Sequence, residues 1–399
     1  MQDNILHEKF SEEMAYTFDD VTLVPRYSDI MSRSSGEIDI SIDIGCNIKN
    51  IERHGENDWN LDIPLISTCM PDITDLNMAI KMRELGGMGI VHRFDEYDDY
   101  EKLMNDYVWA DGDGLEYENR DFNNIGFAVG SILKDDNTYS REKDRIDCYW
   151  GNGVKLFFVD IAHGDSRHGI ETIKYIKSLE NDFGKEGREH NIVVSGSVAN
   201  RDCVQRLVDA GADMIRVGVG DGSLCTTRLV TGHGVPQLTA IQWVREELDK
   251  IDNHKVLVIS DGGIKETGDI VKALAAGADL IMSGSLFAGS IDTPAEIIEK
   301  DGLSYKKYRG MASLDAYKMR DTKNVTPEGV STLVPLKSGI DRILPRISAG
   351  MCSGFSYTGA INAKELRDRS RFVRITNSGF VEGTPHGLMR GGRGQRAGK

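Results

Sequence analysis

Short apolar stretches alternate with longer amphipathic stretches through most of this chain. The apolar stretches are rich in β-branched residues and read as strands that are buried on both faces. The segments between them, such as residues 201–212 and 268–278, repeat apolar positions at helical spacing and end at a glycine. The pattern predicts eight strands, at residues 63–67, 88–91, 125–129, 154–160, 191–196, 213–218, 255–260 and 279–284.

Eight strand and helix repeats predict an α/β fold, a (β/α)8 barrel with N-terminal and C-terminal extensions. An open doubly wound sheet is the alternative, although it rarely needs eight such regular units. We expect residues 1–350 to form one catalytic barrel, with a helix and a surface loop inserted at 93–124, and residues 351–385 to complete it. The Gly/Arg-rich residues 386–399 are expected to be disordered, and an RNA contact there is the less favoured interpretation.

Composition argues against several classes of protein. No run of residues is long and apolar enough to span a membrane, and residues 1–10 lack a cleavable signal pattern, so we expect a cytoplasmic protein. The net charge of −15 disfavours nonspecific binding to nucleic acid, so any phosphate must be held locally. The six cysteines show neither metal-binding nor disulfide spacing.

Small and polar residues gather directly after five of the predicted strands. Because the active site of such a barrel lies at the carboxyl ends of its strands, these loops should carry the chemistry. The loops after the last two strands suit a phosphate held by backbone N–H groups, although their glycines could instead serve ordinary tight turns. The five loops read STCMPD, DIAHGDS, GDGSLCTTR, SDGGI and SGSLFAG.

The stretch VGVGDGSLCTTR, residues 217–228, contains the candidate nucleophile Cys225. A reactive cysteine must be partly exposed and near positive charge or N–H donors, because the thiolate is the attacking species. The glycines leave backbone groups free here, and Arg228 follows three residues later. The residues alone leave open an inert, buried thiol.

Five motifs occur in an order that resembles the family of IMP dehydrogenases and GMP reductases. The resemblance spans nearly the whole predicted barrel and its C-terminal extension. It implies that Cys225 attacks C2 of a purine nucleotide and forms a covalent adduct while a hydride passes to or from a nicotinamide. The motifs are FDDVTLVP, GVGDGSLCTTRLVTGHGVPQLTAI, ISDGGIKETGDIVKALAAGAD, SGSLFAG and YKKYRGMASLDA.

The same resemblance implies roles for single residues. Thr227 and Glu328 would act with Cys225 in catalysis, and Asp160 would lie beside the cofactor. Asp261 would hold the ribose hydroxyls of the nucleotide. The full set of residues implied to bind the nucleotide is Ser67, Met70, Ser223, Asp261, Gly262, Gly263, Gly284, Ser285, Tyr308, Gly310 and Met311.

A monovalent cation and a homotetramer are also implied by the resemblance. The cation, K⁺, would be held by a ring of oxygen ligands to which two subunits contribute. The residues implied to form the ring are Gly220, Gly222 and Cys225 of one subunit, with Glu382, Gly383 and Thr384 of another.

Simpler interpretations exist for several of these residues. Asp160 and Asp261 could be helix N-caps at the turns after their strands. Glu328 lies between a proline and a glycine and could decorate a turn. We leave His163 and His233 outside the catalytic set, because a lone histidine in a loop is more often an ordinary polar residue.

The segment between YRGM and TPEG separates the two reactions of the family. Members that oxidise IMP resolve the covalent intermediate with an Arg-Tyr pair on a long mobile flap, whereas members that reduce GMP expel ammonia with a Thr and Glu pair. The flap expected here, at about 312–335, is short; it contains Tyr317 and Arg320 but no adjacent Arg-Tyr pair, and the sequence has no room for paired CBS domains. We therefore expect NADPH- or NADH-dependent deamination of GMP or dGMP to IMP and ammonia.

Two alternatives to this expectation stay open. One is an IMP dehydrogenase that forms XMP with NAD, because RLVTGHGVPQLTA, PEGV and VEGTPHG resemble that branch. The other is a nucleotide-binding sensor with weak catalysis. STCMPD, the SGS at 195–197 and Arg93 depart from both branches, which leaves the cofactor preference and the base contacts open.

Overall fold

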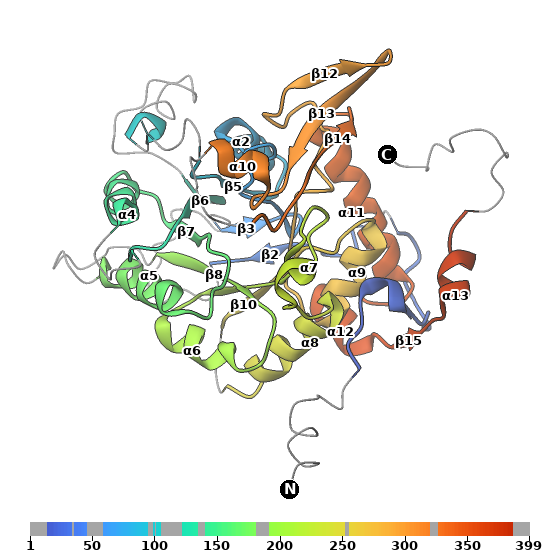
Figure 1. The fold of residues 1–399 in the computed structure, drawn as a ribbon. Coiled ribbons are helices and arrows are strands. Elements are labelled where there is room, and N and C mark those ends of the chain that lie inside the picture. Colours follow the sequence, from blue (N-terminus) through green and yellow to red (C-terminus); the bar gives the residue numbers. More distant parts are fainter. Residues whose placement is uncertain are drawn as a thin grey trace, which may run out of the picture.

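The computed structural model describes residues 14–33, 36–45, 59–94, 99, 101–104, 122–134, 140–180, 191–251, 255–319 and 326–385. It contains each of the eight predicted strands: β4 (Leu65–Ser67), β5 (Met88–Val91), β6 (Ile125–Val129), β7 (Leu156–Val159), β8 (Ile192–Val198), β9 (Met214–Val217), β10 (Leu257–Asp261) and β11 (Leu280–Ser283). They close into a parallel barrel in the order β10-β11-β4-β5-β6-β7-β8-β9 (Figure 1). The (β/α)8 barrel is thereby confirmed.

Helices cover the outside of the barrel, as Figure 1 shows. The two helices predicted at 201–212 and 268–278 end at Gly211 and Gly277, whose φ values of 100° and 122° favour glycine. The helices around the barrel are α2 (Leu76–Glu84), α4 (Arg141–Gly151), α5 (Arg167–Ser178), α6 (Cys203–Ala210), α8 (Gln237–Leu248), α9 (Thr267–Ala276), α11 (Ile340–Ser356) and α12 (Ala363–Arg369).

The apolar core has two layers. One lies between the strands and the surrounding helices, and the other fills the barrel itself with side chains such as Ile66, Met88 and Phe158. A small antiparallel pair, β2 (Ile42–Asp43) and β3 (Asn60–Leu61), contributes apolar side chains to the inner layer. These residues pack against the first residues of several strands, so the amino end of the barrel is closed and the carboxyl end is left for chemistry.

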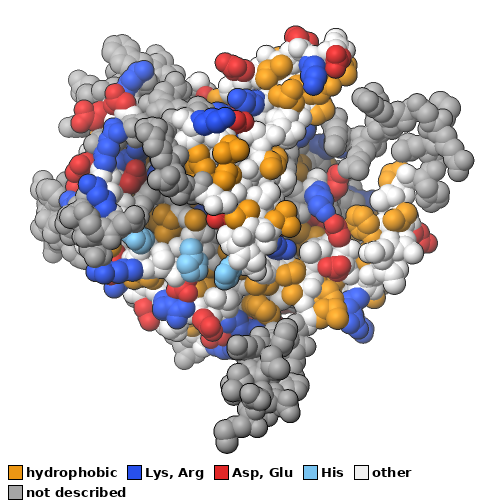
Figure 2. All heavy atoms as spheres, viewed as in Figure 1, with side chains coloured by type: hydrophobic (Ala, Val, Ile, Leu, Met, Phe, Trp, Pro, Cys, Tyr) orange, Lys and Arg blue, Asp and Glu red, His pale blue; other side chains and the backbone are white. Residues whose placement is uncertain are grey.

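Two small antiparallel sheets outside the barrel contain strands from the C-terminal part of the chain. Strand β1 (Val21–Leu23) pairs with β15 (Phe372–Arg374), and the strands β12 (Ile297–Lys300), β13 (Leu303–Arg309) and β14 (Ser331–Pro335) form a separate antiparallel sheet. The sequence analysis did not predict these pairings, because each joins short strands that lack a clear alternating pattern. Figure 2 shows hydrophobic side chains along the projecting β12–β13 hairpin, with charged side chains at its tip.

The segment expected to form the flap, at about 312–335, contains regular structure near both of its ends. Residues 314–319 form helix α10 (Leu314–Met319), and residues 331–335 belong to β14. The boundary expected at residue 350 falls inside α11. Most of the insertion at 93–124, Arg320 and the tail 386–399 lie outside the described residues. Among the helices that are described, none has the length and apolar character needed to cross a membrane.

Candidate active site

The loop between β9 and the short helix α7 (Thr227–Thr231) carries Cys225. Its course requires glycine at two positions, because Gly218 and Gly220 have φ of 152° and 81°. A Cβ on Gly218 would lie 2.0 Å from the carbonyl oxygen of Asp261 at the end of β10. The loop therefore passes directly over the neighbouring strand and keeps Cys225 at the carboxyl end of the barrel.

Cys225, Thr227 and Glu328 form a chain of hydrogen bonds. The Cys225 thiol donates to Thr227 Oγ1 at 3.1 Å, and that hydroxyl donates to Glu328 Oε2 at 2.7 Å. The backbone N–H of Thr227 also donates to the sulfur, at 3.5 Å. All three residues are half-buried, so a ligand can reach them. This arrangement can carry a proton between the sulfur and the carboxylate, as an activated cysteine requires.

The backbone fixes Glu328 in this place. Its carbonyl accepts from the N–H of Thr226 at 2.8 Å, and its own N–H donates to the carbonyl of Ala312 at 2.9 Å. Val330 donates to the carbonyl of Leu224 at 3.0 Å. The segment around Glu328 thus lies between the Cys225 loop and the residues after β13. Glu328 is part of a built site and does not merely decorate a turn.

Ser223 and Gly284, on the loops after β9 and β11, converge with Tyr308 of β13. Ser223 Oγ and the Tyr308 hydroxyl lie 3.1 Å apart, and a Cβ on Gly284 would approach that hydroxyl to 2.9 Å. Ser67, at the end of β4, has a buried Oγ without a hydrogen-bond partner in the structure. Hydroxyl donors around a bare glycine backbone suit a phosphate group, and the unpaired hydroxyl of Ser67 is a polar atom that a ligand could satisfy.

The glycine-rich turn after β10 lies against the Cys225 loop. Gly262 and Gly263 have φ of 97° and 75°, so these positions favour glycine for backbone reasons alone. The N–H of Gly263 donates to the carbonyl of Asp221 at 3.0 Å, and Ser285 Oγ donates to the carbonyl of Ile264 at 2.9 Å. The loops after β9, β10 and β11 are therefore joined into one surface.

An ion pair joins the loop after β4 to the end of β13. Arg309 donates to Asp72 through its backbone N–H and through Nε, each at 2.8 Å to Oδ2. Asp72 is 4% exposed, so this pair is well shielded from water. The contact brings Met70 to the same end of the barrel as Gly310 and Met311.

Asp160 and Asp261 face a common guanidinium. Arg216 of β9 lies 3.8 Å from Asp160 Oδ1 through NH2 and 3.4 Å from Asp261 Oδ2 through NH1. Neither aspartate caps a helix, because Ser166 caps α5 and Glu266 occupies the N-cap position of α9. The simpler N-cap interpretation of these two residues is therefore wrong.

The carboxylates in this region are poorly solvated. Burial raises the pKa of Asp261 above its ordinary value, and the charge of Asp160 adds to this although Arg216 opposes it. Burial, followed by the charge of Asp261, raises the pKa of Asp221 to about 8, with Arg228 acting in the opposite direction. Burial of these two carboxylates thus favours their neutral forms and makes their charged neighbours matter to them.

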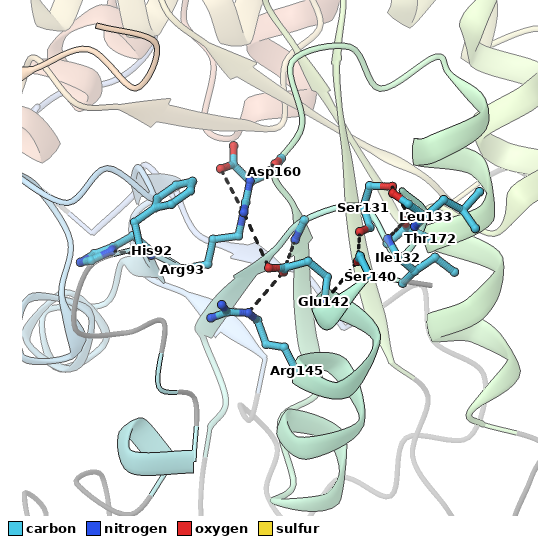
Figure 3. Close-up of polar contacts among 12 residues, drawn as sticks. His92, Arg93, Ser131, Ile132, Leu133, Ser140, Glu142, Arg145, Asp160 and Thr172 are labelled. Atoms are coloured by element: carbon cyan, nitrogen blue, oxygen red, sulfur yellow. Dashed lines mark hydrogen bonds and ion pairs between the residues drawn. The ribbon is translucent and has the colours of Figure 1, made fainter. Parts of the chain in front are cut away.

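A second arginine holds Asp160 from the outside, as Figure 3 shows. Arg93 Nε lies 3.7 Å from Asp160 Oδ2, and its NH2 donates to the Asp160 carbonyl at 3.2 Å. Arg93 also lies 3.8 Å from Glu142, which accepts from the N–H of Gly130 at 2.6 Å and pairs with Arg145 at 3.3 Å. Helix α4 therefore anchors the side of the site to which Asp160 belongs.

The residues expected to bind a cation are not brought together in one chain. Three of them lie on the Cys225 loop, whereas the others lie at the end of α13 (Asn377–Glu382), which Figure 1 places at the edge of the molecule, away from α7. The ring is therefore incomplete within one chain, and we route no catalytic step through a cation. Nor does the described part of the chain contain a cluster of His, Cys, Asp and Glu suited to a metal ion.

Sequence reasoning missed the charged residues that organise this site. Arg216 could have been found, because it is the one charged residue in the stretch MIRVG, residues 214–218, of a strand predicted to be buried. The pairing of Asp72 with Arg309 joins residues 237 positions apart, and no local sequence pattern predicts it. His163 and His233 are exposed and stay outside the relay.

Comparison with known proteins identifies the family of this chain. The family model described as "IMP dehydrogenase / GMP reductase domain" matches residues 15–386. An inosine-5'-monophosphate dehydrogenase of Borreliella burgdorferi is 32% identical over 94% of this chain and 97% of its own length. Proteins of the same name from Aquifex aeolicus, 29% identical over 94% of this chain and 95% of theirs, and from Cryptosporidium parvum, 32% identical over 93% and 94%, are also similar. This chain belongs to the IMP dehydrogenase / GMP reductase family, whose members are nicotinamide-dependent oxidoreductases of purine nucleotides.

Proposed function

We propose that this protein oxidises IMP to XMP with NAD. The hydrogen-bonded chain of Cys225, Thr227 and Glu328 carries the proposal, because it provides a nucleophile and a proton acceptor at the barrel mouth. The relatives described above support IMP as the substrate, since each is named an inosine-5'-monophosphate dehydrogenase. The short flap favoured GMP reduction in the sequence analysis, whereas the names of the relatives favour IMP oxidation.

The Cys225 sulfur adds to C2 of IMP in the first half of the reaction. The thiol proton passes through Thr227 to Glu328 and is then delivered to N3 of the ring, so Glu328 is ionised again before the second half of the reaction. NAD, when bound, would supply the acceptor for the hydride of C2, and a thioimidate protonated at N3 would remain on Cys225. A water molecule then adds to C2 while Thr227 passes one of its protons to Glu328. The C–S bond breaks, the sulfur takes the proton back, and the second proton of water is released with XMP.

Other residues of the chain position the two ligands. Ser223, Tyr308 and the backbone at Gly284 provide donors for the 5′-phosphate. Asp261 is a half-buried acceptor suited to a ribose hydroxyl, and Asp160 presents a second carboxylate on the opposite side of Arg216. An ionised carboxylate accepts hydrogen bonds only, so both positions fit hydroxyl groups of sugars. We propose that Asp160 contacts the dinucleotide.

Reductive deamination of GMP is the second candidate, and the flap favours it. Helix α10 ends at Met319, so only eight residues precede Glu328, and they include no adjacent Arg-Tyr pair. In this reaction the relay would run in the opposite direction, because Glu328 would donate a proton through Thr227 to the departing ammonia. The reduced cofactor would then supply the hydride to C2, and Cys225 would leave to give IMP.

Absorbance at 340 nm distinguishes the two reactions. For the dehydrogenase we expect a rise with IMP, NAD and KCl, and XMP among the products. A fall with GMP and NADPH or NADH, together with released ammonia, would overturn the proposal in favour of the reductase. If the absorbance changes with neither pair of substrates although the protein binds the nucleotides, the result would support a nucleotide-binding sensor with weak catalysis.

We also propose that the protein is a tetramer in which Glu382, Gly383 and Thr384 of one subunit complete the cation ring of another. The exposed Phe380 and Val381 on α13 support an interface there, because apolar side chains of this size favour burial. Light scattering measures the mass. Replacing KCl by LiCl should lower the rate, and a monomeric, cation-independent enzyme would contradict the proposal.

A further inference from the structure

Arg216 lies between the two halves of the site. It extends from β9 with its NH1 at 3.4 Å from Asp261 and its NH2 at 3.8 Å from Asp160, and NH2 also donates to the carbonyl of Ile161 at 3.4 Å. Charge-assisted hydrogen bonds are typically about 2.7–2.9 Å long. Both carboxylate contacts of Arg216 are therefore loose, and the guanidinium is shared between the aspartates without being committed to either.

The surroundings of Arg216 make this sharing energetically important. Its side chain is only 8% exposed, and its Nε is buried with no hydrogen-bond partner in the structure. The guanidinium lies over the ring of Phe158, 4.8 Å from its centroid, which fills the space on the other side. Water can do little to screen a charge in this position, so a small movement toward either carboxylate changes the energy of both contacts.

The two aspartates differ in how firmly they are held. Asp160 is fixed from outside by Arg93, which contacts both its carboxylate and its carbonyl and is held in turn by Glu142 (Figure 3). Within the described part of the chain, Asp261 forms an ion pair with Arg216 and with no second arginine. A ligand hydroxyl that donates to Asp261 would take over part of the role of Arg216 and free the guanidinium to move toward Asp160.

We propose that Arg216 is a positioning residue that couples binding of the nucleotide to binding of the dinucleotide. A ribose hydroxyl on Asp261 lets Arg216 close on Asp160, which then presents its second oxygen in a fixed orientation to the cofactor. The coupling is reciprocal, so each ligand tightens the site for the other by the same factor. This inference rests on the proposed function for the assignment of Asp261 and Asp160 to the two ligands.

Equilibrium binding tests the coupling without turnover. In a Cys225→Ala background, which cannot form the adduct, calorimetry gives the dissociation constant of NAD with and without saturating IMP. We expect IMP to tighten NAD binding by about tenfold, within the range usual for coupled sites. Adding Arg216→Gln should reduce this factor to less than about twofold. Arg216→Lys keeps the positive charge but lacks the planar guanidinium that can contact two carboxylates at once, so it should restore part of the factor.

The matched control is Arg206→Gln in the same background, because Arg206 forms an exposed ion pair with Asp165 at 2.6 Å outside the relay. It should leave the coupling factor unchanged. The proposal is overturned if the Cys225→Ala protein shows no coupling, or if Arg216→Gln or, should that variant not fold, Arg216→Lys keeps the full factor. Failure of the proposed function is seen separately, in the 340 nm assay of the unmodified enzyme. If that assay shows GMP reduction, the same titrations are made with GMP and NADPH.

Discussion

Two loops at the carboxyl end of the barrel each carry a cysteine, and they differ in almost every physical respect. The loop after β4 is closed: Cys69 is 2% exposed, and the Thr74 hydroxyl donates back to the carbonyl of Thr68 at 2.7 Å. The loop after β9 is open, since it turns on glycines and leaves Cys225 half-buried beside Thr227. Residue type and position at the end of a strand therefore do not make a nucleophile; access and a proton acceptor do.

Electrostatics widens the difference between the two thiols. Burial raises the pKa of Cys69 well above its ordinary value, and the charge of Asp160 adds to the effect while Arg216 opposes it. The Cys225 thiol instead donates to a hydroxyl that is itself hydrogen-bonded to a carboxylate. Cys69 is a packing residue inside the charged mouth, whereas Cys225 is half-buried at the site that we propose for the substrate.

The largest effect is expected from exchanging each thiol for alanine. Cys225→Ala should lower turnover by at least about four orders of magnitude, because the relay then has no nucleophile to serve. Nucleotide binding, measured by calorimetry, should stay close to that of the unmodified protein. Cys69→Ala should lower the melting temperature because it leaves a cavity, but should preserve covalent chemistry. Equal loss of turnover in both variants would remove the distinction between the loops.

Glu328→Gln tests whether the proton acceptor sets the open loop apart. The amide keeps an oxygen that can accept from Thr227, but it cannot take up a proton, so we expect kcat to fall by about 10²- to 10³-fold. Steady-state kinetics with IMP as the varied substrate give kcat and KM. Thr227→Val should cause a loss of similar size because it breaks the same chain. If Glu328→Gln retained full kcat, another group would have to accept the proton.

The barrel and the loops could be predicted from the sequence because both have local signatures. Eight apolar runs and the glycines that end the helices define the fold, and the residues GDGSLCTTR identify an unusual loop. The partner of the loop, Glu328, is brought to it by a segment about a hundred residues away, and only the family resemblance pointed to it. The charge network around Arg216 depends on three strands meeting, so no single stretch of sequence contains it.

Thiol alkylation sharpens the comparison through its pH dependence. At pH 7.5 iodoacetamide should modify Cys225 at least about a hundredfold faster than Cys69, because the thiolate is the reactive form. The raised pKa of Cys69 means that its thiolate forms only at higher pH than that of an ordinary thiol, so its labelling should begin only in more alkaline solution. Peptide mass spectrometry measures both sites. Saturating IMP should protect Cys225, whereas rapid labelling of Cys69 at neutral pH would show that its loop opens.

The smallest effect is expected from loosening the closed loop. Asp72→Asn keeps an oxygen for the backbone N–H of Arg309 but removes the charge that its guanidinium contacts, so the end of β13 beside Tyr308 should lose its fixed position. Since Tyr308 lies 3.1 Å from Ser223 in the region proposed for the phosphate, we expect KM for the nucleotide to rise.

A rise of about tenfold in KM corresponds to 1.4 kcal/mol, a modest share of what breaking a buried pair can cost. The value of kcat should change much less, because Cys225 and its relay do not touch Asp72. Asp165→Asn, which breaks the exposed pair with Arg206, is the matched control and should leave both constants nearly unchanged. A fall in kcat at constant KM would show that the closed loop acts on the chemistry of the open one, and the two loops would then have to be treated as a single catalytic unit.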